Sequence, residues 1–345
     1  MARIDLTVRG AGIFGLSIAW AARQRGAQVQ IVDPNGPASG SSGGIVGALA
    51  PHVPENWNAK KAFQLESLLM AGAFWAEVEA ESGVRSGYAR SGRIQPITDA
   101  QSLQLAQQRT QTAKELWAEK ATWQITEQAP AKWAPVSATG CYIHDTLSGV
   151  IHPRKACASL VAALQSRGVI IEAEAPIKAP TLLATGVAGL KEMSEQHNRS
   201  VGSGVKGQAA LLRYDAQGLP QIFGNGLHIV PHADGTVAVG STSERLFDVP
   251  DQTDEKLDAL VSDARTLVPA LIDAPLIERW AAARPRARSR APMLGALPHK
   301  PNHYVANGGF KIGFGMAPKI AEVMVDLILE GRDNIPAGFR VEDNL

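Results

Sequence analysis

The stretch that decides the fold is GAGIFG, at residues 10–15. Its glycines, Gly10, Gly12 and Gly15, have the spacing of a dinucleotide-binding turn. The first allows a tight turn, the second lets the backbone approach a pyrophosphate, and the third lets a helix pack on a strand. The preceding IDLTV alternates as a short strand, and the following FGLSIAWAARQRG carries small and apolar residues at helical spacing until Gly26. This order of strand, turn and helix predicts a nucleotide site.

A second strand and an acidic residue follow in the order that a nucleotide site requires. The stretch AQVQIVD ends in Asp33, eighteen residues after Gly15, where a carboxylate can accept hydrogen bonds from ribose hydroxyls. Residues 34–58 are then rich in Gly, Ser and Pro, which predicts a loop. Because this loop contains the apolar run IVGALA, we favour a segment wrapped around a ligand over a flexible linker.

The composition is that of a globular protein with a hydrophobic core. Of the 345 residues, 45% are hydrophobic and 19% are charged, and the length suffices for two domains or one domain with an inserted lobe. The net charge of +1 predicts neither a nucleic-acid surface nor a membrane surface. The sequence has no run of about 18 apolar residues. It enters a strand without a signal-peptide pattern, so we expect a cytoplasmic protein.

The sequence contains no metal-ligating pattern, and no metal site is predicted. Cys141 and Cys157 do not have metal-ligand spacing and are too few for a disulfide framework. We expect both to be buried small apolar residues. The eight histidines are scattered along the chain and form no HxxxH pattern.

Periodicity outlines the remaining elements. Helices are expected at 60–83, at 99–121, from Pro153 onward and at 253–268, and strands dominate residues 205–243. The stretch ERWAAARPRARSRAPMLGALP, residues 278–298, is interpreted as irregular and basic. Near the end, HYVANGGFKIGFGMAPKIAEVMVDLILEG predicts a strand, a glycine-rich turn and a helix. Both ends of the chain therefore supply a strand, a glycine loop and a helix, with a β-rich lobe between them.

Several sequence blocks together resemble one family, the flavin-dependent D-amino-acid oxidase superfamily, and within it the glycine oxidase-like branch. The resemblance covers nearly the whole chain. The blocks are GAGIFG with Asp33, ASGSSGGIVGALAPH, SGVIHPRKACASL, LLATG, VKGQAALL, HIVPHADGTVAVGSTSE, AARPRARSRAPMLG and GGFKIGFGMAPKIAEVMVDLI. It implies an α/β fold (α+β overall) in which a Rossmann-like FAD-binding domain is interleaved with a β-rich substrate-binding domain. The FAD-binding domain would comprise residues 1–83, 136–204 and 284–345, and the substrate domain residues 84–135 and 205–283.

The resemblance implies FAD as the cofactor. By the family pattern Asp33 would bind the adenosine ribose, and the helix that starts near Met316 would direct its N-terminus at the flavin. Covalently flavinylated members use a cysteine in the region that corresponds to residues 284–316, where this chain has none, so we expect non-covalent FAD. The other residues that the family pattern assigns to the cofactor are Gly10, Ala11, Gly12, Ile13, Gly15, Ser41, Ser42, Gly47, Ala48, Leu49, Gly186, Gly308, Gly309, Phe310, Lys311, Ile312 and Gly313.

The resemblance also implies substrate-binding residues. Arg284 matches the family arginine that holds the substrate carboxylate by a two-pronged contact. His228 stands where glycine oxidases have an active-site tyrosine, and Lys311 stands where they have a second arginine. His52 matches a glycine oxidase histidine and would lie near the flavin. These departures leave FAD in place and put glycine in doubt as the substrate. The remaining arginines of the basic stretch are interpreted as solvated: Arg286, Arg288 and Arg290.

The expected activity is FAD-dependent oxidation of glycine, sarcosine or a small D-amino acid. A hydride would pass from the α-carbon to flavin N5, leaving an imine that hydrolyses, with O2 as the acceptor. A glycine-oxidising member would serve thiamine synthesis. Three alternatives stay open: an oxidase acting on a carboxymethylaminomethyl-uridine in tRNA, a dehydrogenase using a non-oxygen acceptor, and a protein that holds FAD without turnover. Relatives are often dimers or tetramers, so a homo-oligomer is compatible with the resemblance.

Overall fold

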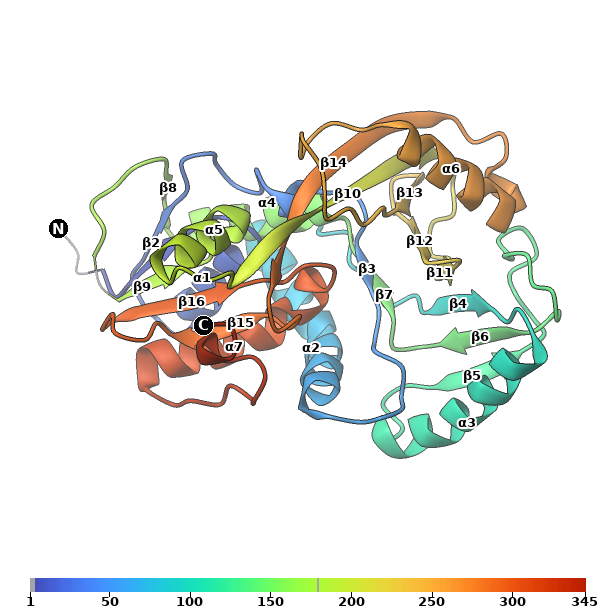
Figure 1. The fold of residues 1–345 in the computed structure, drawn as a ribbon, viewed down its shortest axis with the longest axis horizontal. Helices are drawn as coiled ribbons and strands as arrows, with labels where there is room; N and C mark the ends of the chain where they lie inside the picture. The colour runs from blue at the N-terminus through green and yellow to red at the C-terminus, as the bar shows by residue number, and fades with distance from the viewer. Residues whose placement is uncertain (1–3, 179) are drawn as a thin grey trace.

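The computed structural model describes residues 4–178 and 180–345, in which two large β-sheets lie at opposite ends of the molecule (Figure 1). Over these residues one sheet has six strands and the other has eight. The chain crosses between the sheets several times, as the interleaved plan predicts. None of the helices in the described part is long and apolar enough to cross a membrane.

The six-stranded sheet is mostly parallel and carries the glycine turn. In spatial order its strands are β15 (Met293–Ala296), β16 (His303–Asn307), β9 (Thr181–Leu183), β1 (Leu6–Arg9), β2 (Val29–Val32) and β8 (Ile171–Glu172). Only the β15–β16 pair is antiparallel. The helices of this half are α1 (Ile13–Gln24), α2 (Ala59–Ser82), α4 (Pro153–Ser166), α5 (Gly186–Gln196) and α7 (Gly313–Glu330). The predicted succession of strand, turn, helix and strand is confirmed as β1, α1 and β2.

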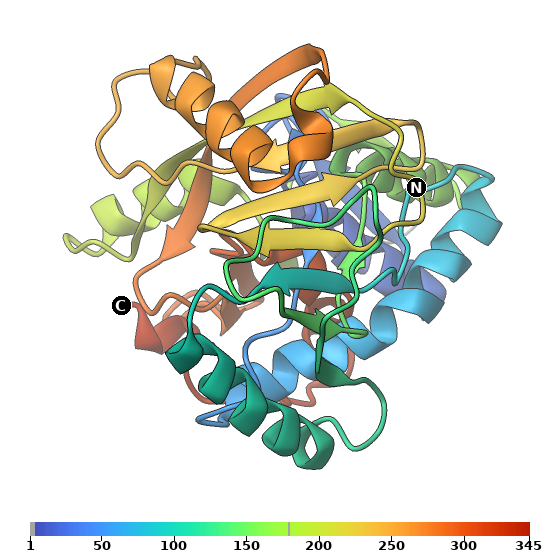
Figure 2. The same cartoon turned by 90° about the vertical axis from the view of Figure 1, so that its right-hand side faces the viewer.

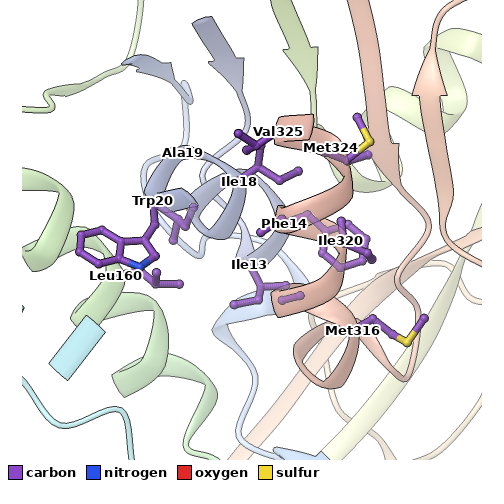
Figure 3. Close-up of a cluster of buried hydrophobic side chains, with 14 of the residues drawn as sticks. Ile13, Phe14, Ile18, Ala19, Trp20, Leu160, Met316, Ile320, Met324 and Val325 are labelled. Atoms are coloured by element: carbon purple, nitrogen blue, oxygen red, sulfur yellow. The ribbon is translucent and has the colours of Figure 1, made fainter. Parts of the chain in front are cut away.

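The main hydrophobic core lies where α1 meets α7 (Figure 3). Helix α1 buries every residue from Ile13 to Trp20, because its neighbours α4 and α7 cover it on two sides. The helix can lie this close to β1 only because Gly15 has no side chain. A Cβ atom at Gly15 would lie 1.9 Å from the carbonyl oxygen of Gly10.

The eight-stranded sheet is antiparallel except where β11 meets β4. In spatial order its strands are β14 (Leu276–Ala287), β10 (Gly202–Arg213), β13 (Thr236–Gly240), β12 (Leu227–Pro231), β11 (Gln221–Gly224), β4 (Arg93–Pro96), β6 (Tyr142–Asp145) and β5 (Trp123–Thr126). Figure 2 views this half from outside, with α6 (Glu255–Leu267) and α3 (Ala100–Leu116) at its two ends. A small two-stranded sheet pairs β3 (Ala48–Leu49) with β7 (Gly149–Val150) between the halves.

The helices expected from periodicity are confirmed as α2, α3, α4 and α6, although α3 ends at Leu116 rather than at residue 121. Helix α5 was not predicted from the sequence. It begins at Gly186, the last residue of the LLATG block. The domain boundaries stay a prediction. Strand β6 pairs with the eight-stranded sheet, whereas residues 136–204 were expected to belong to the cofactor domain.

The prediction that residues 278–298 are irregular is wrong. Most of this stretch forms β14 and β15, and β14 pairs with β10 along nearly its whole length. Pro285 lies within β14 although it lacks a backbone N–H. It is tolerated because β14 is the edge strand of its sheet. The carbonyl oxygen of Pro285 accepts a hydrogen bond from Phe310 N at 2.9 Å, so this edge is joined to the glycine-rich turn before α7.

Candidate active site

One cavity of about 1320 Å³ extends between the two sheets. Small-molecule sites usually have volumes of about 300–1,000 Å³, so this cavity can hold more than one small ligand. The glycine turn after β1 and the loop after β2 line one part of it. His228 of β12, Arg284 of β14 and the turn before α7 line another part. The cavity therefore brings together residues that are far apart in the sequence.

The glycine turn has the geometry of an anion site. Gly10 adopts a φ of +105°, and a Cβ atom there would lie 2.3 Å from the carbonyl oxygen of Ala184, so only glycine fits. Helix α1 begins directly after Gly12 and carries no acidic residue in its first turn. Its N-terminal amides lie beside the cavity, and Ile13 N donates to Ser42 Oγ at 3.0 Å. Backbone N–H groups and the helix dipole favour a phosphate here.

Asp33 lies beside this turn, at the end of β2. Its Oδ2 accepts a hydrogen bond from Ala11 N at 2.7 Å, and its Oδ1 accepts one from Asn35 N at 3.0 Å. The carboxylate also lines the cavity, so a ribose hydroxyl next to the phosphate site can donate to it. The glycine turn and the Asp33 carboxylate together fit a dinucleotide.

Asp33→Ala is expected to weaken FAD binding by about 1.5–3 kcal/mol, the usual contribution of a hydrogen bond to a charged acceptor, or roughly 10- to 100-fold in Kd. Quenching of free FAD fluorescence by apoprotein measures this Kd. Asp251→Ala is the matched control, because Asp251 is an exposed carboxylate that lines the same cavity from a loop. Equal FAD affinity in the Asp33 variant and the wild type would remove Asp33 from the nucleotide site.

Most residues expected at the cofactor line this cavity: Gly10, Gly12, Ile13, Asp33, Ser41, Ser42, Gly47, Ala48, Gly186, Gly308, Gly309, Phe310, Lys311, Ile312 and Gly313. Three expected residues do not line it. Ala11 and Leu49 are buried in the core, and Gly15 packs α1 on β1. Helix α7 begins at Gly313, before the predicted start near Met316, so its N-terminus lies on the cavity wall itself.

Arg284 is buried, with 8% of its surface exposed, yet it lines the cavity. Its Nη1 donates to Ser241 Oγ at 2.6 Å, and its Nη2 donates to the carbonyl oxygens of Thr242 at 2.7 Å and Lys206 at 3.4 Å. Its buried Nε has no hydrogen-bond partner among the described residues. A Cβ atom at Gly207 would lie 2.4 Å from Arg284 Cζ, so the absence of that side chain makes room for the guanidinium.

Burial without a carboxylate partner lowers the pKa of Arg284 to about 10, although distant Glu244 partly opposes this effect. The guanidinium still keeps its charge at neutral pH. In the described part of the chain, Arg284 forms no ion pair of 4 Å or less. A buried cation with an unsatisfied donor beside a cavity is the arrangement that a carboxylate ligand would complete.

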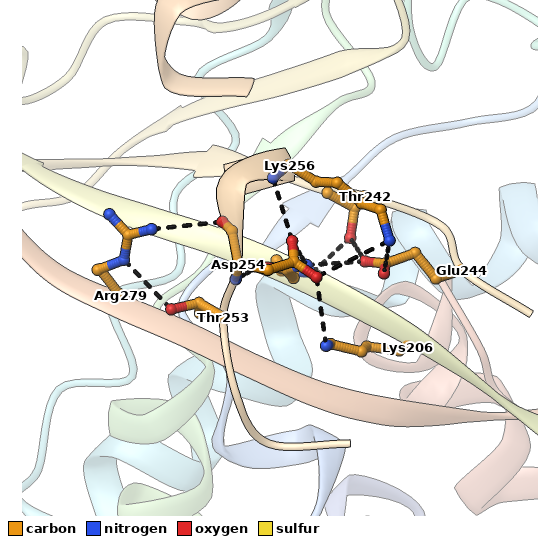
Figure 4. Close-up of polar contacts among 8 residues, drawn as sticks. Lys206, Thr242, Glu244, Thr253, Asp254, Lys256 and Arg279 are labelled. Atoms are coloured by element: carbon orange, nitrogen blue, oxygen red, sulfur yellow. Dashed lines mark hydrogen bonds and ion pairs between the residues drawn. The ribbon is translucent and has the colours of Figure 1, made fainter. Parts of the chain in front are cut away.

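A network of polar side chains holds the segment around Thr242, to which Arg284 donates a hydrogen bond (Figure 4). The Glu244 carboxylate accepts hydrogen bonds from Thr242 Oγ1 at 2.6 Å, from Gln208 Nε2 at 3.0 Å and from Lys256 Nζ at 2.8 Å. The backbone of Thr242 is thereby fixed, and its carbonyl oxygen receives the Arg284 guanidinium. The network orients the arginine without neutralising it by direct contact.

Lys311 also lines the cavity, in the turn before α7. Its Nζ lies 5.6 Å from the centroid of the Phe310 ring, and Arg284 Cζ lies 5.2 Å from the same centroid. Partial burial and the nearby charge of Arg284 lower the pKa of the Lys311 amine. The two cations therefore share one region of the cavity.

His228 is a neutral imidazole with an assigned tautomer. Burial, together with the charges of Arg93 and Lys311, lowers the pKa of His228 to about 3. Its Nδ1 lies 3.3 Å from Gln221 Oε1, while Gln221 Nε2 donates to the carbonyl oxygens of Gly149 at 2.7 Å and Leu49 at 3.3 Å. Because the amide oxygen can only accept, Nδ1 carries the proton, and Nε2 is left as an acceptor.

The low pKa of His228 gives a stability prediction. Between the ordinary pKa near 6.5 and the folded pKa near 3, the unfolded chain binds a proton that the folded protein does not. The contribution of the neutral His228 ring to the free energy of unfolding is therefore complete above about pH 6.5, and it is lost as the pH falls toward 3. When the pH is lowered from 7 to 5, the free energy of unfolding is expected to fall by about 1–2 kcal/mol less in His228→Gln than in the wild type. Urea denaturation at both pH values measures this, and equal losses would contradict a buried neutral imidazole.

His52 does not lie on the cavity wall. It is exposed, and its backbone N–H donates to Gln64 Oε1 at 2.7 Å, while its Nδ1 contacts the same oxygen. Partial burial of the ring lowers the pKa of His52. The geometry gives no support to the expected place beside the flavin, because this hydrogen bond ties His52 to α2.

Sequence analysis missed the residues that support the site. Gln221, Ser241 and the Glu244 carboxylate act through other side chains, and Trp280 lines the cavity from β14. No local motif marks these positions. The buried Gln221, which is 0% exposed, could have been suspected only from its place in a predicted apolar strand. Within the described residues no cluster of potential metal ligands is found.

Comparison with known proteins gives the family. A family model described as FAD dependent oxidoreductase matches residues 5–327. The chain belongs to this family. The family is FAD-dependent, and the cavity lined by the glycine turn, Asp33 and the N-terminus of α7 has the features of a dinucleotide site.

The chain is also similar to individual proteins. The chain is 26% identical over 365 residues to the bifunctional protein ThiO/ThiG of Nostoc sp., covering 96% of this chain and 53% of that protein. It spans about half the length of the three ThiO/ThiG relatives that it matches. The glycine oxidase of Geobacillus kaustophilus has the same fold, with a TM-score of 0.84, 20% identity and 99% coverage of both chains.

A further solved structure shares the fold. The iminodiacetate oxidase of Chelativorans sp. superposes with a TM-score of 0.84 at 20% identity, covering 97% of this chain and 98% of that one. At this identity the likeness establishes the fold and leaves the substrate open. The expected fold class, a Rossmann-like FAD-binding domain with a β-rich companion, is confirmed.

Proposed function

We propose that the protein oxidises the carbon–nitrogen bond of a small amino acid or amine that carries a carboxylate, and that O2 accepts the electrons. The buried Arg284, which has no carboxylate partner among the described residues and lines the same cavity as the glycine turn, carries this proposal. The glycine oxidase and ThiO/ThiG relatives support it. Glycine, sarcosine and small D-amino acids are the first candidates.

The residues of this chain would position the substrate. Arg284 would take the carboxylate through its free N–H groups, because its other donors are bound to Ser241, Thr242 and Lys206. This contact fixes the substrate relative to the rest of the cavity, and orientation supplies much of the rate in such reactions. His228 Nε2 would accept a hydrogen bond from the substrate amine, since Gln221 engages Nδ1.

Bound FAD would supply the oxidant, which takes two electrons from the substrate. The chain would contribute an electrostatic environment for the resulting negative charge, because the N-terminus of α7 begins on the cavity wall at Gly313. The neutral state of His228 lets its ring act as an acceptor throughout the physiological pH range.

An anaerobic absorbance titration of the holoprotein tests the proposal. Glycine, sarcosine, D-alanine and D-proline are added separately, with a carboxymethylaminomethyl-uridine nucleoside as the competing candidate. Bleaching of the flavin band by a small amino acid is the expected result. Bleaching by the nucleoside alone would favour the tRNA alternative, and no bleaching by any compound would overturn amino-acid oxidation. Oxygen uptake compared with dye reduction then separates an oxidase from a dehydrogenase.

A further inference from the structure

We propose that the preferred substrate carries two carboxylates, so that Arg284 binds one and Lys311 binds the other. This inference rests on the proposed function and narrows its substrate class to amino dicarboxylates. It follows from the charges that surround the Phe310 ring at one end of the cavity. Phe310 itself lies in the turn before α7 and lines that end.

Two cations that line this part of the cavity have no carboxylate partner. Neither Arg284 nor Lys311 forms an ion pair with an acidic side chain in the described ranges 4–178 and 180–345. The buried Arg93, by contrast, is neutralised, because it forms an ion pair with Asp145 at 2.9 Å. Asp251 also lines the cavity, but it is exposed and forms no ion pair with either cation.

The spacing of the two cations suits one small molecule. Arg284 Cζ and Lys311 Nζ lie 5.2 and 5.6 Å from the same ring centroid, so they are at most about 11 Å apart. Charge-assisted contacts take up roughly 3 Å at each end. The remaining span is within the reach of two carboxylates on one small amino acid.

The charges in this part of the cavity also favour a substrate with two carboxylates. Among the other titratable groups nearby, His228 is neutral, and the Glu244 carboxylate is engaged by Thr242, Gln208 and Lys256. Arg286 lies near the Phe310 ring but does not line the cavity. The pocket therefore offers two positive charges. An amino dicarboxylate whose amine has lost its proton carries two negative charges, whereas glycine or sarcosine in the same state carries one. A monocarboxylate would leave one cation uncompensated in a partly desolvated site.

Two substrate pairs that differ by one carboxylate test the inference: D-alanine against D-aspartate, and sarcosine against iminodiacetate. The anaerobic rate of flavin bleaching divided by the apparent Kd is measured for each compound. The dicarboxylate of at least one pair is expected to exceed its monocarboxylate by tenfold or more. In Lys311→Met this ratio is expected to fall to about one or below. Equal values for both members of each pair in the wild type would overturn the inference.

Arg286→Met is the matched control. Arg286 Cζ also lies near the Phe310 ring, at 5.8 Å, but Arg286 does not line the cavity. Its replacement removes a nearby positive charge and should leave the dicarboxylate preference within about twofold. A loss of preference in Arg286→Met as large as in Lys311→Met would show a general charge effect and would contradict a Lys311 subsite.

A binding measurement separates this inference from the proposed function. Succinate and propionate cannot be oxidised as amines, and their binding is followed by the shift that they cause in the flavin spectrum. Succinate is expected to bind at least tenfold more tightly than propionate to the wild type and about equally in Lys311→Met. This result would support the subsite even if no amine bleached the flavin. Equal affinities in the wild type would overturn the subsite even if monocarboxylic amino acids were oxidised.

Discussion

Arg284→Met is expected to lower kcat/KM for carboxylate substrates by roughly 30- to 1,000-fold, while FAD stays bound at wild-type stoichiometry. The corresponding loss of about 2–4 kcal/mol is the usual cost of truncating one partner of a buried charged contact. Methionine fills most of the space of the arginine stem, so the pocket next to Gly207 should not collapse. Steady-state kinetics together with the flavin-to-protein absorbance ratio measure both parts of this prediction.

The control for this prediction separates local from general charge effects. Arg286 belongs to the same strand, β14, but does not line the cavity, so Arg286→Met should keep kcat/KM within about threefold of the wild type. Arg284→Lys is also informative, because a lysine keeps the charge but cannot make a two-pronged contact. Arg284 would be excluded from substrate binding if Arg284→Met retained wild-type kinetics with every carboxylate substrate.

Gly15→Ala is expected to destabilise the protein by about 3 kcal/mol or more and to reduce FAD retention strongly. The added Cβ would lie 1.9 Å from the Gly10 carbonyl oxygen, and backbone atoms at that distance cannot rotate away as a side chain would. Helix α1 would have to move off β1, which would displace the amides that face the phosphate site. Urea denaturation and the FAD content after gel filtration are the two measurements.

Gly72→Ala is the matched control. Gly72 lies on the exposed side of α2, and a Cβ atom there would meet nothing within 4 Å. Alanine is preferred over glycine in a helix by about 0.5–1 kcal/mol, so this variant should be slightly more stable than the wild type. If Gly15→Ala were as stable and as rich in FAD as Gly72→Ala, the close contact of α1 with β1 would not be required.

Local sequence patterns predicted the elements that depend on local chemistry. The spacing of Gly10, Gly12 and Gly15 predicted the turn, and the steric requirement is strict at Gly10 and Gly15, where a Cβ atom would lie 2.3 and 1.9 Å from backbone oxygens. Helical periodicity located α2, α3 and α6, since their apolar residues recur on one face. The strand β14 escaped prediction because its buried positions do not alternate, and because Pro285 is acceptable only on an edge that the sequence does not reveal.

By itself the sequence determined the nucleotide turn, the acid at the end of β2 and, through its resemblance to a family, the cofactor. Only the tertiary structure decided which polar residues meet. It brings Arg284 and Lys311 to one ring, ties His52 to Gln64 of α2 by a hydrogen bond, and gives His228 its proton position through Gln221. The physical reason is that charge, desolvation and hydrogen bonding act through space, between strands and turns that come from distant parts of the chain.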